Sequence, residues 1–146
     1  MEPEDVSFQI LKEITNGFSE LLKLGEGTFG EVYKGLTENG EEVAVKKLRC
    51  IDPCLDDKLF EKEFKNLMKL NHNNIVRFLG YCYETEKISI ECNGRMVLAE
   101  QTHRALCFEF MDNGSLDKHL SGMLLLLLCI QGSFGLRVFV DHPKEE

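Results

Sequence analysis

Three glycines spaced GxGxxG, at Gly25, Gly27 and Gly30, are the residues of this chain with the clearest chemical potential. Glycine lets a backbone fold tightly over a phosphate and direct its N–H groups at the oxygens. The same spacing serves dinucleotide-binding folds, but there the third glycine opens a helix. Here Val32 and Tyr33 follow, which favour a strand. The pattern therefore predicts a phosphate-binding loop between two strands.

A lysine ends the next strand signal, EVAVK at residues 42–46. Side chains alternate along a strand, so Ala44 and Lys46 share one face and Val43 and Val45 share the other. Ala44 leaves room for a flat ring, and Lys46 can reach a phosphate. A solvated lysine on an edge strand is the alternative, and the neighbouring glycine loop favours the phosphate-binding interpretation.

A carboxylate lies on the apolar face of the helix that we expect over residues 55–70. The apolar stripe contains Leu59, Leu67 and Leu70. Glu63 falls on the same face, where a carboxylate is costly unless it is paired. It could lean out to water at the edge of the stripe. We instead predict an ion pair with Lys46 on the preceding strand.

These motifs together resemble the small lobe of eukaryotic protein kinases. The resemblance rests on GxGxxGxV at residues 25–32, VAVK ending at Lys46, and FEKEFKNLMKL, which is similar to the kinase αC helix. The opening segment, FQILKEITNGFSELLKLGEGTFGEVYKG, resembles the segment just before the kinase domain in plant receptor-like kinases. The match covers residues 18–120 and indicates the N-terminal, ATP-binding lobe of a receptor-like serine/threonine kinase.

The resemblance implies a set of ATP-binding positions. These are Leu24, Gly25, Glu26, Gly27, Thr28, Phe29, Gly30, Val32, Ala44, Lys46, Phe108, Glu109, Met111 and Ser115. Leu24, Val32 and Ala44 would form the adenine ceiling, or simply pack in a core. Phe108 would be the gatekeeper, and the backbone of Glu109 and Met111 would pair with the adenine edge. Ser115 would approach the ribose or cap the next helix.

The Lys46–Glu63 pair would hold the lysine toward the α- and β-phosphates, as in complete relatives that use Mg-ATP. Residues 121–146, in contrast, resemble no part of the second kinase lobe. No residue of the chain corresponds to the catalytic aspartate or to the magnesium ligands of kinases. HRA at 103–105 and SFG at 133–135 match the kinase motifs only by chance. We therefore expect a truncated domain without catalytic residues, without a metal site and without kinase activity as this chain.

Two alternatives remain open for the function. The chain could be a non-catalytic interaction module or decoy that competes with full-length receptor-like kinases for their partners, because an unpartnered lobe exposes an apolar underside. It could also be a non-functional fragment from a truncated or misjoined coding region. Beyond ATP, the partners considered are other kinases and signalling proteins.

The expected fold is α+β: a twisted, five-stranded antiparallel sheet, one main helix over residues 55–70, and no complete second lobe. Residues 1–17 should form a juxtamembrane-like helical segment. Residues 6–18 carry Ile10, Leu11, Ile14 and Phe18 at helical spacing, which predicts a short docking helix with Ser7 as its N-cap and Gly17 as its stop. A hairpin over 87–100 should be inserted between strands at 75–83 and 104–111, followed by an unrelated apolar tail at 121–146.

The composition restricts partners and location. Seventeen basic against 25 acidic residues give a net charge of −8, which argues against nucleic acid and anionic membranes. The six cysteines include no CxxC pair and the start is acidic, so we expect reduced thiols and a cytoplasmic location, or association with the plasma membrane through a receptor partner. The apolar run at 123–130 is too short to span a bilayer.

Overall fold

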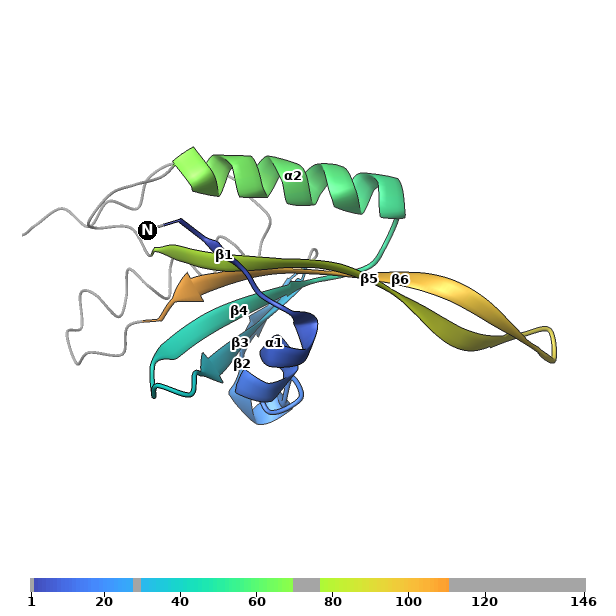
Figure 1. Cartoon of the computed structure of the whole chain (residues 1–146), viewed down its shortest axis with the longest axis horizontal. Helices are drawn as coiled ribbons and strands as arrows, with labels where there is room; N and C mark the ends of the chain where they lie inside the picture. Colours follow the sequence, from blue (N-terminus) through green and yellow to red (C-terminus); the bar gives the residue numbers. More distant parts are fainter. Residues whose placement is uncertain (1, 28–29, 70–76, 111–146) are drawn as a thin grey trace, which may run out of the picture.

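The fold is one mixed sheet with a helix against each of its faces, seen edge-on in Figure 1. The computed structural model describes residues 2–27, 30–69 and 77–110. The strand order is β1-β5-β6-β4-β3-β2. The strands are β1 (Glu4–Asp5), β2 (Lys23–Glu26), β3 (Gly30–Leu36), β4 (Glu42–Leu48), β5 (Phe78–Cys92) and β6 (Arg95–Glu109). The helices are α1 (Phe8–Ile14), α2 (Pro53–Lys69) and a 3-10 turn at Glu20–Leu22.

The predicted α+β small lobe is confirmed, and strands β2 to β6 form its five-stranded antiparallel sheet. The sequence interpretation did not include β1, which adds a sixth strand parallel to β5. The strand consists of two charged, exposed residues, which give no periodic pattern, so it could not be predicted from the sequence. The backbones of β1 and β5 approach so closely at Gly80 that only glycine fits there, since a Cβ would lie 2.8 Å from the Glu4 carbonyl oxygen.

Strands β5 and β6 each run for 15 residues and form one continuous hairpin that projects from the sheet (Figure 1). The sequence interpretation divided this hairpin into separate pieces, because polar residues interrupt the apolar alternation. The structure instead joins those residues across the strands. Thr85 and Thr102 hydroxyls lie 2.9 Å apart, and His103 Nε2 lies 2.8 Å from Glu86 Oε1. The ladder therefore continues from the sheet to the turn at Asn93 and Gly94.

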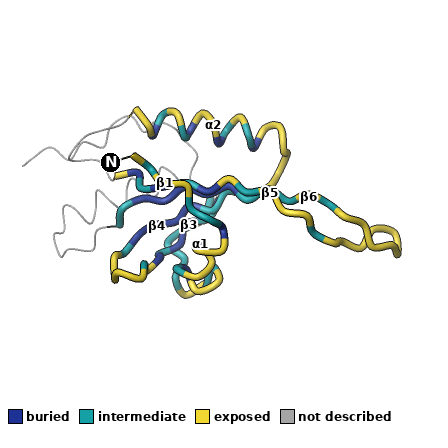
Figure 2. Tube along the Cα trace, viewed as in Figure 1, coloured by how far each residue is buried: buried dark blue, intermediate teal, exposed yellow. Residues whose placement is uncertain are grey.

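Alternation along the central strands produces a separate apolar layer on each side of the sheet, and Figure 2 shows burial concentrated there. The layer beneath α2 contains Val32, Ala44, Phe60, Leu67, Phe78, Leu106 and Phe108. The layer beneath α1 contains Phe8, Leu11, Val43, Val45, Cys82, Ala105 and Cys107. The prediction that Ala44 lies on one face of β4, and Val43 and Val45 on the other, is therefore confirmed.

Helix α1 begins as expected at Ser7, whose Oγ accepts a hydrogen bond from the Ile10 amide at 3.2 Å. Its inward face differs from the predicted stripe. Leu11 is buried, but Ile10 is about half exposed, with 49% relative accessibility. Phe8 is buried in its place and stacks on the His103 ring at 3.7 Å between centroids. The prediction for Ile10 was wrong because packing against β6 sets the rotation of this short helix.

Helix α2 begins at Pro53, two residues earlier than predicted. Asp52 Oδ1 accepts hydrogen bonds from the amides of Cys54 and Leu55 at 3.0 and 3.3 Å, which is the arrangement of an N-cap. Proline is favoured at the first helical position because its missing N–H would have no partner there. Phe60 adds a buried aromatic ring to the face that carries Glu63 and Leu67.

No helix within the described ranges is long and apolar enough to cross a membrane. The predicted tail at 121–146 lies outside the described residues, as do Leu70, Thr28, Phe29, Met111 and Ser115.

Candidate functional site

The centre of the candidate site is an ion pair between the sheet and α2. Lys46 Nζ lies 2.9 Å from Glu63 Oε1, and the two side chains retain only 1% and 5% of their accessible surface. The structure therefore forms the predicted pair. Because both charges have left water, each depends on the other for compensation. The alternative in which Glu63 leans into solvent is excluded by its burial.

The predicted adenine ceiling is brought together around this pair. In the sheet, Lys46 lies between Val32 of β3 and Leu106 of β6, and Ala44 lies beside Phe108. Val32, Ala44 and Phe108 are each exposed by 1% or less. Leu24, from β2, is partly buried against the same cluster. These residues thus share a face with Lys46, and in this conformation they pack as core.

The glycine-rich segment turns back on itself between β2 and β3. Gly25 lies opposite Val32 and Glu26 opposite Glu31. The Gly27 amide donates to the Gly30 carbonyl oxygen at 2.9 Å, so this N–H bonds within the turn. Gly30 has a reason of its own to be glycine: a Cβ would lie 2.5 Å from the Lys47 carbonyl oxygen. The third glycine is thus required by strand packing, independently of any phosphate.

A charged cluster at the base of this loop was not found by sequence reasoning. Lys23 Nζ lies 2.7 Å from Glu26 Oε2 and 3.7 Å from Glu31 Oε1, while Arg49 approaches Glu31 at 3.6 Å. Tyr33 donates its phenolic hydrogen to Glu31. Burial and this hydrogen bond raise the pKa of Tyr33 to about 12, and the same bond lowers the pKa of Glu31. These contacts tie β2, β3 and the end of β4 together.

At the predicted hinge, Glu109 ends β6. The Glu109 amide donates to the Arg77 carbonyl oxygen at 2.9 Å, and Glu109 lies opposite Val43 of β4 in the sheet. The second predicted hinge residue, Met111, lies outside the described residues, and so does Ser115. The contribution of this backbone to adenine binding stays a prediction.

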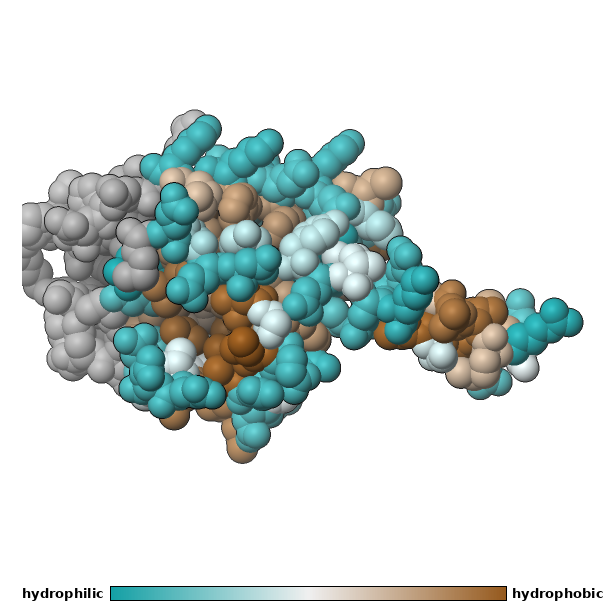
Figure 3. Space-filling view, in the orientation of Figure 1, coloured by the Kyte–Doolittle hydropathy of each residue, from teal (hydrophilic) through white to brown (hydrophobic). Residues whose placement is uncertain are grey.

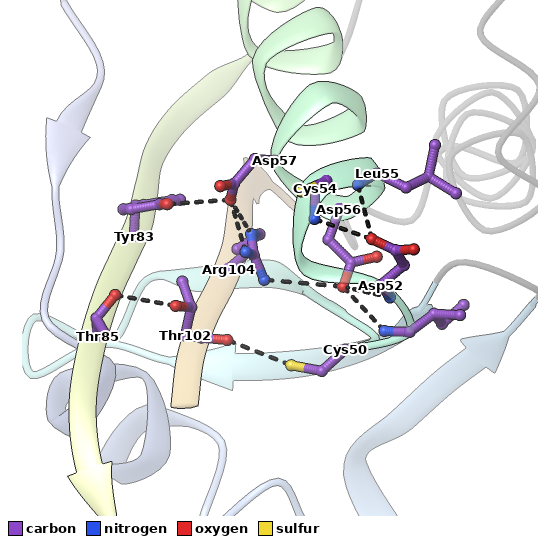
Figure 4. A network of polar contacts seen from close by, with 11 residues as sticks. Cys50, Asp52, Cys54, Leu55, Asp56, Asp57, Tyr83, Thr85, Thr102 and Arg104 are labelled. Carbon is purple, nitrogen blue, oxygen red and sulfur yellow. Dashed lines mark hydrogen bonds and ion pairs between the residues drawn. The ribbon is translucent and has the colours of Figure 1, made fainter. Parts of the chain in front are cut away.

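A second polar network, shown in Figure 4, joins the start of α2 to the middle of the hairpin. Arg104 donates from Nε and Nη2 to Asp57 Oδ1 at 2.9 and 2.6 Å, and Tyr83 donates to the same oxygen at 3.0 Å. Asp56, which accepts from the Ile51 and Asp52 amides, lies 4.0 Å from the guanidinium. Arg104 is the middle residue of the HRA triplet. It lies within β6, and its hydrogen bonds to Asp57 hold the start of α2 against this strand.

The described residues fit a nucleotide in part. The buried lysine and the small Ala44 on the same face suit phosphate and ring binding, and the glycine turn begins on β2, two strands away from Lys46 in the sheet. The burial of Val32, Ala44 and Phe108 means that an adenine ring could reach them only after they are uncovered. Within residues 2–27, 30–69 and 77–110 no group of three or more His, Cys, Asp or Glu side chains could hold a metal ion.

Comparison with known proteins identifies the family. The protein kinase domain model matches residues 18–129. Cysteine-rich receptor-like protein kinase 28 of Arabidopsis thaliana is 39% identical over 115 residues, covering 79% of this chain and 14% of that protein. Proline-rich receptor-like protein kinase PERK3 of the same organism is 38% identical over 144 residues, covering 92% of this chain and 25% of that protein.

The chain thus spans a minor part of the length of these relatives. Among solved structures, an apo pseudokinase superposes with a TM-score of 0.57 at 24% identity, over 82% of this chain and 39% of the other. That likeness shows the fold. The chain therefore belongs to the protein kinase family, and its described residues have the architecture of the kinase small lobe.

Proposed function

We propose that this lobe binds ATP as the N-terminal lobe of a receptor-like serine/threonine kinase, with Lys46 directed toward the α- and β-phosphates. The observation that carries the proposal is the buried Lys46–Glu63 pair at 2.9 Å, which fixes a cation on the sheet face that Val32 and Ala44 share. A lysine held by a helical glutamate is the arrangement that protein kinases need for phosphoryl transfer. Other similar proteins of Arabidopsis thaliana are named serine/threonine-protein kinases, which supports the choice of substrate class, protein serine and threonine hydroxyls.

Several groups of this chain would take part in binding. The backbone of the turn at Gly25 and Gly27 would cover the phosphates, and Lys46 would neutralise part of their charge. Leu24, Val32 and Ala44 would contact the adenine ring. ATP supplies the γ-phosphoryl group that the family transfers. Because the ring-contacting residues are buried in the present conformation, binding must open this face and is weak, with a dissociation constant on the order of 1 mM.

Among the 146 residues, none corresponds to the catalytic aspartate or to the magnesium-binding motifs of the second kinase lobe. We therefore propose that this chain alone transfers no phosphate. The domain division remains part of the proposal: a helical segment at 1–17, a partial kinase domain at 18–120 and a tail at 121–146, although the family match runs to residue 129. The lobe would act in the cytoplasm, or at the plasma membrane with a receptor partner.

The test combines a transfer assay and a binding assay on the purified chain. Radiolabelled ATP with Mg²⁺ and a serine/threonine peptide pool should give no phosphate incorporation, whereas a fluorescent ATP analogue should bind weakly and be displaced by ATP. Binding should disappear in the double variant Lys46→Met/Glu63→Leu, which replaces both buried charges and so preserves the fold.

Lys47→Met is the matched control, because Lys47 is the next residue of β4 and its ammonium lies over the Phe18 ring at 4.6 Å, on the α1 side. That variant should bind like the original chain. Binding unchanged in the double variant would contradict the proposed site. Phosphate incorporation that is lost in the double variant but not in Lys47→Met would contradict the proposed inactivity.

A further inference from the structure

The projecting part of the β5–β6 hairpin has two unpaired edges within the described chain. Strand β1 pairs with β5 only at Gly80 and Tyr81, and β4 pairs with β6 only as far as Ala105. Beyond these points no described strand lies against the outer edges of residues 84–92 and 95–101. A free edge presents rows of backbone N–H and C=O groups that can pair with another strand.

This hairpin also carries apolar side chains that the lobe does not use. Ile90 and Val97 are cross-strand neighbours, as are Ile88 and Ala99, so the four share one face. Ile90 is 42% exposed and Val97 is 40% exposed. Figure 3 shows apolar surface on the projecting hairpin, with polar residues at its tip. An exposed apolar strand with a free edge is suited to strand pairing.

The outer edge of β5 has a self-complementary sequence, KISIE at residues 87–91. In an antiparallel pair of two copies with Ser89 opposite Ser89, Lys87 lies opposite Glu91 of the second copy, and Ile88 lies opposite Ile90. Symmetry makes each of these contacts twice. Lys87 lies opposite Glu100 of β6, but within the residues that the structure describes neither Lys87 nor Glu91 forms an ion pair, so both charges can make such contacts.

Geometry selects this register. A two-fold axis normal to the sheet keeps each residue on the same face in both copies. Residues that pair across two strands also lie on one face, and side chains alternate between faces along a strand. The numbers of two paired residues must therefore differ by an even number. Lys87 and Glu91 meet this condition. Moving the centre by one residue, to Ile88 or Ile90, removes both charge pairs, and centring on Lys87 or Glu91 opposes like charges.

The other edge of the hairpin lacks this property. On the unpaired part of β6, residues 95–101, the opposite charges are Arg95 and Glu100, whose numbers differ by five, so they cannot face each other across a symmetric antiparallel pair. Glu100 and Arg104 differ by four, but Arg104 is buried and already donates to Asp57. The allowed registers place Met96 opposite Glu100 or Arg95 opposite Ala99. The charge complementarity therefore favours β5.

We propose that residues 87–91 of β5 pair with the same residues of a second copy of this chain, joining two hairpins into a four-stranded sheet with Ser89 at the two-fold axis. The proposal is independent of nucleotide binding. A five-residue edge buries far less than the area of a standard stable interface, so the dimer is weak, with a dissociation constant on the order of 100 µM. The hairpin projects from the lobe (Figure 1), so the two lobes of this dimer would lie apart.

Charge exchange tests the pairing by sedimentation equilibrium over a range of concentrations. Lys87→Glu should weaken the dimer about tenfold, because it places like charges opposite each other at two symmetric positions. Adding Glu91→Lys should restore affinity to within about threefold of the original chain. The control Lys87→Glu/Glu38→Lys has the same net charge but changes the exposed Glu38 in the β3–β4 turn, and it should stay weak.

Cysteine trapping tests the register. In Ser89→Cys the two new thiols would face each other at about 5 Å between Cα atoms, within disulfide range, so mild oxidation should give a dimer linked through residue 89. The native, exposed Cys92 is the internal control, since its two copies would be about 20 Å apart and should not link. A monomer at millimolar concentration, a dimer insensitive to the charge exchange, or a link through Cys92 would overturn the proposal.

Discussion

At the scale of single residues, the buried charges of Lys46 and Glu63 depend on each other. Each has lost its hydration, and their mutual attraction at 2.9 Å offsets that loss. The spacing of the sequence could predict this pair because strand and helix periodicity each fix a face. It could not predict the clamp from Arg104 to Asp57, since that contact depends on where α2 begins over β6, 47 residues away along the chain.

The first prediction concerns this pair. Lys46→Met should lower the free energy of unfolding by about 3 kcal/mol, because it leaves the Glu63 carboxylate buried without a partner. Glu63→Leu should cost about as much for the converse reason. The double variant should recover most of the loss, which urea unfolding followed by circular dichroism would measure. Costs that simply add in the double variant would show that the two side chains do not depend on each other.

A second residue-scale prediction concerns the thiols. Burial raises the pKa of Cys82 and of Cys107 to about 12. At about pH 8.5 iodoacetamide should therefore label the exposed Cys50, Cys54 and Cys92 and leave the two buried thiols unmodified, as read by peptide mass spectrometry. Labelling of Cys82 or Cys107 at the same rate as Cys92 in the folded chain would disprove this.

The same shift has a consequence for stability. Unfolded thiols ionise near pH 8.5, whereas the folded thiols keep their protons to about pH 12. The stabilisation from proton binding by the folded state is thus complete below about pH 8.5 and is lost as the pH rises toward 12. Tyr33, with its pKa raised to about 12, adds to this alkaline loss above about pH 10.

At the scale of elements, the polar network at the start of α2 determines how this helix is held over the sheet. Arg104 is 5% exposed and donates twice to Asp57, while Tyr83 binds the same oxygen. Helix and strand types follow from periodicity, and most were predictable. The strand lengths of β5 and β6 were not, because cross-strand pairs such as Thr85 with Thr102 continue the ladder through a polar stretch that has no apolar alternation.

Replacing this clamp gives the third prediction. Arg104→Met should lower the free energy of unfolding by about 2 kcal/mol, because it removes charge-assisted hydrogen bonds to α2. Hydrogen exchange should accelerate at the amides of residues 54–57 first. Arg95→Met, at the exposed turn of the same strand, is the matched control and should leave both quantities unchanged. Equal effects of the two variants would argue against the clamp.

At the scale of the whole molecule, the lobe and its projecting hairpin are separable. The buried residues of both apolar layers on these strands lie at Phe78, Cys82 and residues 105–108, and none lies between 86 and 101. Sequence alone could predict an inserted hairpin. It could not show that the strands of the sheet continue into it without a break, because that requires the pairing register.

The fourth prediction follows from this separation. Replacing residues 86–101 by an Asn-Gly turn that joins Thr85 to its neighbour Thr102 should change the midpoint of thermal unfolding by less than about 4 °C, since no core contact is removed. The dimer should disappear in the same variant. A shortened chain that fails to fold would show that the hairpin belongs to the folding unit.

The most direct test of the central claim, that this is a nucleotide-binding kinase lobe centred on Lys46, is an ATP titration of the isotope-labelled chain followed by amide NMR shifts. We expect saturable shifts, with a dissociation constant on the order of 1 mM, at the amides of Gly25, Gly27 and residues 44–46. These should be lost in Lys46→Met/Glu63→Leu and kept in Lys47→Met. Shifts confined to other parts of the lobe, or shifts that survive in the double variant, would contradict the claim.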